Sequence, residues 1–185
     1  EAPKINCSNP EESKAHPLQS CWTAADLKKP VIFIWGDSYA AHLTTGYEER
    51  FGKEFLITRK FYNGCPPIMD LELPNRQNCT AKNQKIFEEV LKEQPAKLII
   101  AANWTDYDWK KIADTIAKLQ QAGYQNIDLI GPAPVRSDGL YKQLYLKFLE
   151  DKNPSIPFRM KYGFDTSKDF LAINLAMQEM AKGLN

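Results

Sequence analysis

The stretch Val31-Ile32-Phe33-Ile34-Trp35-Gly36-Asp37-Ser38-Tyr39-Ala40-Ala41-His42 decides how this chain folds. Its first five residues form an unbroken apolar run of β-branched and aromatic side chains, which predicts a buried strand. The Gly-Asp-Ser turn and the small residues after it are typical of a sharp strand-to-helix transition that exposes a serine hydroxyl. Ser38 is therefore a candidate nucleophile. The same three residue types are common in ordinary turns and at helix N-caps, so a purely structural interpretation stays open.

Strand-like and helix-like patterns alternate along the rest of the chain. Further strands are expected over residues 55–58, 97–101 and 126–131. Helices are expected over residues 38–51, 81–93, 109–122, 140–150 and 167–182. Either Asp106 or Asp108 is expected to cap the helix over 109–122, and Gly123 to end it. Strands alternating with helices of this length predict an α/β fold, with a mainly parallel central sheet covered on both faces.

Length and composition indicate one globular domain. The chain has 185 residues, of which 43% are hydrophobic and 25% charged, enough for a single sizeable core. We expect that domain over residues 30–185, after an irregular N-terminal extension over residues 1–29. The formal charge of +1 comes from 24 basic and 23 acidic residues that are mixed along the chain. This pattern argues against nucleic acid as a partner.

Three candidate site residues follow three successive predicted strands. Ser38 follows the first strand, Gly64 follows the second after a short loop, and Asn103 follows the third. In open α/β sheets, ligands bind beyond the carboxyl ends of the strands. We therefore expect these residues to meet at one site. Structural roles remain open for two of them. Gly64 would supply a positive φ in a Pro-rich loop, and Asn103 would cap a turn or begin the third helix.

The chain resembles the SGNH hydrolases, a family named for a serine, a glycine, an asparagine and a histidine on four sequence blocks. More closely, it resembles the extracytoplasmic SGNH domain fused to membrane acyltransferases of the acyltransferase-3 type, which O-acetylate bacterial surface polysaccharides. The segments that carry the resemblance are Gly36 to His42, Gly64 to Pro67 with Cys79 downstream, Leu98 to Trp104, and Gly131-Pro132-Ala133-Pro134. The resemblance covers most of residues 20–135 and implies a three-layer, flavodoxin-like sandwich.

The resemblance implies a division of roles at the site. Ser38 would accept an acetyl group from a fused or partner transmembrane domain and pass it to a glycan hydroxyl. The backbone N–H groups of Ser38 and Gly64 and the side-chain amide of Asn103 would form the oxyanion hole. Asp37 is expected to hydrogen-bond loop backbone and support the turn, because adjacent side chains on a tight turn diverge. This chemistry needs no cofactor, and the sequence shows no metal-ligand cluster.

The family's fourth block, an Asp-x-x-His that supplies the catalytic histidine, is absent from the sequence. The two histidines are His16 and His42. His42 stands four residues after Ser38, on the same helical face but one turn deeper, so we expect it to pack or hydrogen-bond beneath the first strand instead of acting as the base. Two accounts remain open. In the favoured one, the native protein continues past Asn185 into this block; in the other, the chain is a non-catalytic glycan-binding relative.

Four cysteines allow three pairings. Chain order favours Cys7–Cys21 and Cys65–Cys79, because each pair brackets a segment rich in Asn, Pro and charged residues. Disulfides would place the domain in an oxidising compartment, and the resemblance implies the periplasm or the outer cell surface, tethered to the membrane. Four reduced cysteines in a cytosolic protein are the alternative. The spacing disfavours zinc.

Two groups of aromatic residues have more than one interpretation. Tyr39 and Trp104 lie near the predicted site, where they would stack on a sugar ring or pack in the core. A stripe of Tyr141, Tyr145 and Phe148 at helical spacing indicates core packing or a docking face for a partner domain.

The function expected from the sequence is O-acetyl transfer through an acyl-serine to a cell-envelope polysaccharide, such as lipopolysaccharide O-antigen or peptidoglycan. A stand-alone carbohydrate esterase would use the same residues with water as the acceptor. A non-catalytic glycan-binding module is the alternative outside the enzymes. The chain alone is expected to be inactive for lack of the catalytic histidine.

Overall fold

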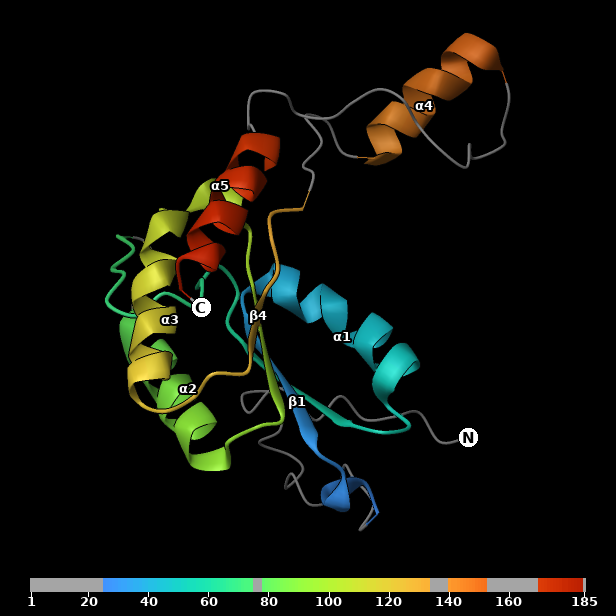
Figure 1. Cartoon of the computed structure of the whole chain (residues 1–185). Helices are drawn as coiled ribbons and strands as arrows, with labels where there is room; N and C mark the ends of the chain where they lie inside the picture. Colours follow the sequence, from blue (N-terminus) through green and yellow to red (C-terminus); the bar gives the residue numbers. More distant parts are fainter. Residues whose placement is uncertain (1–24, 75–77, 134–139, 153–169, 185) are drawn as a thin grey trace.

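The structure, a computed structural model, describes residues 25–74, 78–133, 140–152 and 170–184 (Figure 1). Its strands are β1 (Val31–Gly36), β2 (Leu56–Phe61), β3 (Lys97–Ala101) and β4 (Ile127–Leu129). Its α-helices are α1 (Ser38–Phe51), α2 (Cys79–Glu93), α3 (Ile112–Gln121), α4 (Leu140–Asp151) and α5 (Phe170–Lys182). Its short 3-10 helices are η3 (Asp26–Lys28), η4 (Trp104–Asp106) and η5 (Trp109–Lys111).

The four strands form one parallel sheet in the order β2-β1-β3-β4. This is the flavodoxin-like order, in which the chain winds outward in both directions from β1 and β3. In sheets of this kind, ligands bind outside the carboxyl ends of the strands where the winding direction switches, which here is between β1 and β3. The predicted α/β fold with a parallel sheet is confirmed.

Helices cover both faces of the sheet, because side chains of successive strand residues point to opposite faces. Phe33, Trp35, Leu98 and Ile100 pack against α2, α3 and α5, while Ile32, Ile34 and Ile99 pack with α1. Figure 1 shows α1 on one side of the sheet and the other three helices on the opposite side. Both faces of the central strands are therefore shielded from solvent, which agrees with their unbroken apolar sequences.

Among the strands, β2 has the boundaries that differ most from the prediction. The strand was expected over 55–58, but all six residues from Leu56 to Phe61 pair with β1. The part of β2 that was not predicted contains Arg59 and Lys60, two charged residues that interrupt the apolar pattern typical of a buried strand. In the structure, Arg59 donates to Ala41 O and Thr44 Oγ1 of α1, at 3.3 and 3.2 Å. Lys60 forms an ion pair with Glu89 of α2, so tertiary contacts accommodate both charges within the strand.

The helix predicted over 109–122 begins instead as η5, with α3 starting at Ile112. Neither Asp106 nor Asp108 caps α3: its N-cap is Lys111, which makes no side-chain capping bond. The predicted end is confirmed, because Gly123 has a φ of +91° and its N–H donates to Gln120 O at 2.9 Å. A positive φ at that place favours glycine.

The aromatic stripe of α4 does not pack in the core. Tyr141, Tyr145 and Phe148 are 81%, 60% and 41% exposed, and Figure 1 shows α4 set apart from the other helices. Helical spacing predicts which side chains share a face, but not whether another element covers that face. The core interpretation of this stripe is wrong, and the docking interpretation stays a prediction.

One of the two predicted disulfides lies within the described residues. Cys65 and Cys79 are bonded, with their Cα atoms 5.4 Å apart. Cys7, Cys21 and most of the predicted extension over 1–29 lie outside the described residues, as does the expected start of the last helix at Ser167. In the part of the chain that the structure describes, no helix combines the length and apolar character that a membrane span needs.

Candidate active site

The register of the sheet brings the three predicted site loops to one edge. Gly36, the last residue of β1, pairs with Phe61 of β2 on one side and with Ala101 of β3 on the other. Neighbouring strands lie about 4.8 Å apart. The chain reaches Ser38 two residues after Gly36, so the loops that carry Gly64 and Asn103 flank the serine on its two sides.

Close packing explains why glycine precedes the serine. A Cβ atom on Gly36 would lie 1.8 Å from the carbonyl oxygen of Ala101 and 2.6 Å from the Cβ of Ala40. Only a residue without a side chain lets β1 turn into α1 this close to β3. Ala40 is fully buried, so a small residue is needed there as well. The small residues of the motif thus serve a tight elbow between strand and helix.

Asp37 holds the elbow through both of its carboxylate oxygens. It is the N-cap of α1, and Oδ1 accepts a hydrogen bond of 2.8 Å from the Tyr39 N–H. Oδ2 accepts a bond of 3.1 Å from the N–H of Asn103, in the loop after β3. Asp37 is buried, so its charge relies on these two donors. These are bonds to loop backbone, the kind expected for Asp37 from the sequence.

Ser38 is the first residue of α1 and is partly exposed. The first N–H groups of a helix have no acceptor within the helix, and the helix dipole places partial positive charge there. The Ser38 hydroxyl therefore lies where negative charge is stabilised. This is the environment that a developing oxyanion needs.

Gly64 occupies a tight turn directly after β2. Its φ is +68°, and the turn closes with a 2.9 Å bond from the Cys65 N–H to Tyr62 O. The N–H of Tyr62 donates in turn to Gly36 O, at 3.3 Å. The positive-φ role of Gly64 is confirmed, and its backbone is attached to the end of the strand that carries Ser38.

The side chain of Asn103 is held in one orientation. Its Oδ1 accepts a 2.8 Å bond from Thr105 Oγ, and its Nδ2 donates a 2.6 Å bond to Asp106. An amide nitrogen carries two hydrogens, so one N–H remains for a ligand after the bond to Asp106. Asn103 is partly exposed, which leaves that group within reach of a ligand.

The structure places His42 differently from the expectation that it packs beneath the first strand. Its side chain is exposed on α1, and its ring lies 6.3 Å from that of Tyr39, centroid to centroid. Helix α1 turns this position toward solvent and turns Ala40 and Thr44 toward the protein.

Of the two aromatic residues predicted near the substrate, Tyr39 is partly exposed and Trp104 is not. Trp104 is completely buried, and its indole N–H donates a 2.7 Å bond to Ile130 O. A buried side chain with its polar group satisfied cannot stack on a sugar. The prediction that Trp104 contacts substrate is wrong, and its core interpretation is correct.

Sequence reasoning missed a buried residue beside the site, Asn83 of α2. It stands three residues before Ile86 and seven before Val90, on the helix face that packs in the core. A polar residue at such a position was the available signal, because buried amides need partners. Among the described residues, no group of three or more His, Cys, Asp or Glu side chains is arranged to hold a metal ion.

Comparisons with known proteins agree with this fold. The structure of the periplasmic domain of a Salmonella ser. Paratyphi A lipopolysaccharide acetyltransferase has a similar fold, with a TM-score of 0.66 and 24% sequence identity. The similarity covers 83% of this chain and 64% of that one, so the chain spans less than two thirds of that relative. No curated protein matches the chain. The family described as the SGNH domain fused to AT3 domains matches residues 6–171, and the chain belongs to this family.

Proposed function

We propose that this chain is the SGNH domain of an O-acetyltransferase and that Ser38 carries the acetyl group as an ester. The observation that carries the proposal is the Asp37 carboxylate, which bonds the N-terminus of α1 and the Asn103 loop at the same time. This carboxylate fixes the position of the segment that carries Ser38 relative to the loop that carries Asn103. Acyl transfer needs that kind of arrangement, set before charge develops.

The proposed first step is attack of Ser38 Oγ on the acyl carbonyl of the donor. The carbonyl π electrons move to oxygen, and the N–H groups of Ser38 and Gly64 and the amide of Asn103 stabilise the resulting oxyanion. Collapse of this intermediate expels the donor's leaving group, which takes a proton, and leaves acetyl-Ser38. The Ser38 proton passes to a base, because a protonated hydroxyl is a weak nucleophile.

The second step reverses the first with a new partner. A hydroxyl of the acceptor attacks the acetyl-Ser38 carbonyl and gives its proton to the base, while the same three groups stabilise the oxyanion. Collapse breaks the bond from the acyl carbon to Ser38 Oγ, which takes that proton from the base. A sugar hydroxyl as acceptor gives O-acetylation, and water gives an esterase. Tyr39 stands beside Ser38 and is partly exposed, which supports its ring as a contact for an acceptor sugar.

The proposed setting is the periplasm or another extracytoplasmic compartment. The Cys65–Cys79 disulfide supports an oxidising environment. The family's fusion to AT3 domains supports a transmembrane acyltransferase domain as the source of the acetyl group. We propose a cell-envelope glycan, such as lipopolysaccharide O-antigen or peptidoglycan, as the acceptor.

The test is mass spectrometry of the full-length protein and its Ser38→Ala variant after exposure to p-nitrophenyl acetate. An acetyl adduct on Ser38, absent from the variant, is the expected result. Adding glycan fragments from the envelope should then transfer the label to sugar faster than water removes it. Loss of the label to water alone would identify an esterase. A wild-type protein that never acquires the adduct, yet binds the glycan, would identify a binding module.

A further inference from the structure

We propose that Asn83 is a positioning residue that holds the Gly64 turn in the orientation needed to bind the oxyanion. The role of Gly64 in this inference rests on the proposed function. Asn83 lies in the second turn of α2, four residues after Cys79, and is only 1% exposed. Its contacts are to the loop that follows Gly64 and to the strand that precedes Ser38.

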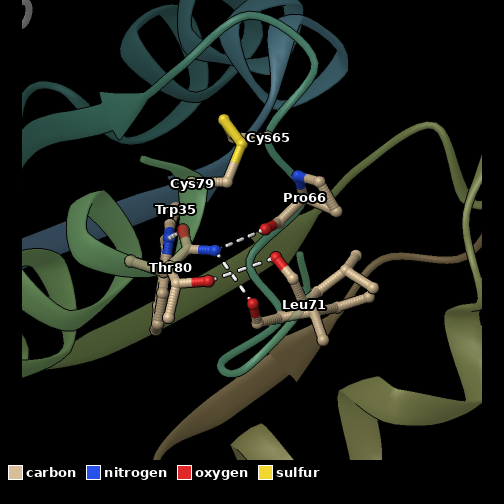
Figure 2. Close-up of a disulfide and its surroundings, with 8 residues drawn as sticks. Trp35, Cys65, Pro66, Leu71, Cys79 and Thr80 are labelled. Carbon is tan, nitrogen blue, oxygen red and sulfur yellow. Dashed lines mark hydrogen bonds between the residues drawn. A yellow bond between two sulfur atoms is a disulfide. The ribbon is translucent and has the colours of Figure 1, made fainter. Parts of the chain in front are cut away.

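The side chain of Asn83 makes three hydrogen bonds inside the protein, which use both of its N–H donors and one lone pair of its oxygen. Its Nδ2 donates to Pro66 O at 2.8 Å and to Ile68 O at 3.0 Å, and its Oδ1 accepts from the Trp35 indole at 3.3 Å. Figure 2 shows Trp35 and Pro66 near each other, beside the disulfide. One buried amide thus joins β1, three residues before Ser38, to the loop two to four residues after Gly64.

This loop cannot hold itself in place through regular backbone pairing. Pro66 and Pro67 lack N–H donors, so the segment cannot continue as a strand beside β1. The buried carbonyls of Pro66 and Ile68 nevertheless need hydrogen bonds. Pro66 O accepts the Ile68 N–H at 2.7 Å, and the Asn83 amide donates a second bond to Pro66 O and a bond to Ile68 O. These two bonds account for a polar residue on the buried face of α2.

Other contacts fix the ends of the loop, and in its middle the two Asn83 bonds add to the bond from the Ile68 N–H to Pro66 O. The Tyr62 N–H is bonded to Gly36 O before the turn, and the Met69 N–H is bonded to Thr115 Oγ, at 2.9 Å, after it. The Cys65–Cys79 disulfide ties the residue after Gly64 to the start of α2 (Figure 2). Because Cys79 and Asn83 share one helix, α2 acts as the support for this loop.

The consequence for catalysis follows from the precision that an oxyanion hole needs. A displacement of about 1 Å, caused by a change away from the reacting atoms, can cost on the order of 100-fold in rate. The peptide plane that carries the Gly64 N–H lies two residues from a carbonyl that Asn83 holds. Loss of the Asn83 amide should therefore slow acylation of Ser38 without weakening substrate binding to the same degree.

The experiment compares Asn83→Ala and Asn83→Ser with Tyr124→Phe in the full-length protein. Asn83→Ser keeps one hydroxyl donor and is the milder change. Tyr124→Phe is the matched control, because it also removes a buried donor to two backbone carbonyls, those of Pro95 and Asn126. These carbonyls lie at the opposite, amino-terminal edge of the sheet. The readouts are kcat and KM for acetylation of Ser38 by p-nitrophenyl acetate, and hydrogen exchange in a peptide covering residues 62–69.

The expected result is a kcat about 100-fold lower for Asn83→Ala, with a smaller change in KM, an intermediate value for Asn83→Ser, and near-wild-type values for Tyr124→Phe. Exchange at residues 62–69 should rise in the Asn83 variants alone. Wild-type kcat in folded Asn83 variants, or unchanged exchange at this loop, overturns the inference and leaves the proposed function standing. Absence of acetyl-Ser38 in the wild-type protein overturns the proposed function, and the role of Asn83 in oxyanion binding with it.

Discussion

The backbone N–H of Asn103 donates a 3.1 Å hydrogen bond to Oδ2 of Asp37, and this bond joins the loops after β3 and β1. The two residues are 66 positions apart in the chain. Their contact sets the Ser38 elbow against the loop that carries the candidate amide. The position of the serine is therefore tied directly to one member of the proposed oxyanion hole.

Replacing Asp37 should affect both stability and reactivity. Asp37→Ala removes the acceptor for two partly buried N–H groups, a helix cap and a loop contact, at a cost of about 1–3 kcal/mol in the free energy of unfolding. Acetylation of Ser38 should also slow. Urea denaturation and acetyl labelling measure the two effects. Asp128→Ala is the control: Asp128 pairs with Lys97 while half-exposed, and such a pair contributes about 1 kcal/mol or less. Equal behaviour of the two variants would contradict the role of Asp37.

Removing the Asn103 amide tests the oxyanion hole itself. Asn103→Ala should lower kcat for Ser38 acetylation by about 100- to 1000-fold and change KM little, because the lost bond forms mainly in the transition state. The control is Asn126→Ala, since that amide donates to Ala96 O at the far edge of the sheet. A rise in KM with unchanged kcat would instead make Asn103 a ground-state binding residue.

The exposed position of His42 predicts that this residue is not the general base. His42→Asn should keep the Ser38 acetylation rate within a few-fold of wild type, with the same pH profile from pH 5 to 8. A general base contributes about 100- to 10,000-fold. A loss of that size in His42→Asn, with normal folding, would overturn this assignment.

Two glycines in one segment of chain should respond to alanine in opposite ways. Gly36→Ala forces a Cβ against Ala101 O, at 1.8 Å, and should destabilise the fold by about 1–3 kcal/mol or more. Gly46 lies within α1 and has open space around it. Gly46→Ala should stabilise by about 0.5–1 kcal/mol, because alanine is the better helix former. Thermal unfolding of both variants decides the point, and a stable Gly36→Ala protein would contradict the tight elbow.

The raised pKa of Tyr124 predicts that the folded protein loses stability at alkaline pH. Burial, with a smaller contribution from the Asp128 charge, raises the pKa of Tyr124 from 10.0 to about 12. Between pH 10 and 12 the unfolded chain releases this proton and the folded chain keeps it, so stability falls as the pH rises. The contribution is complete below pH 10 and amounts to about 3 kcal/mol at most. Unfolding of wild type and Tyr124→Phe across this range should show a steeper decline for wild type. Parallel curves would contradict the shifted pKa.

Local sequence was a good guide wherever one pattern dominated. The helix predicted over 38–51 and the strand over 97–101 have those bounds in the structure, because apolar residues, small residues and caps agree there. It was a poor guide where a distant partner decides the outcome. The predicted range of β2 was too short, because the strand contains two charged residues whose partners lie on α1 and α2. Trp104 was predicted to lie at the site, although it is buried in the core.

The sequence by itself determined the α/β class, the elbow that presents Ser38 and the order in which Gly64 and Asn103 follow the second and third strands. These follow from local periodicity and turn chemistry, which depend on near neighbours in the chain. The tertiary structure alone decided that Asp37 reaches Asn103, that Asn83 bonds the Gly64 loop and that the aromatic face of α4 is exposed. Those outcomes depend on strand order and register, since buried polar groups find partners only once the elements have packed.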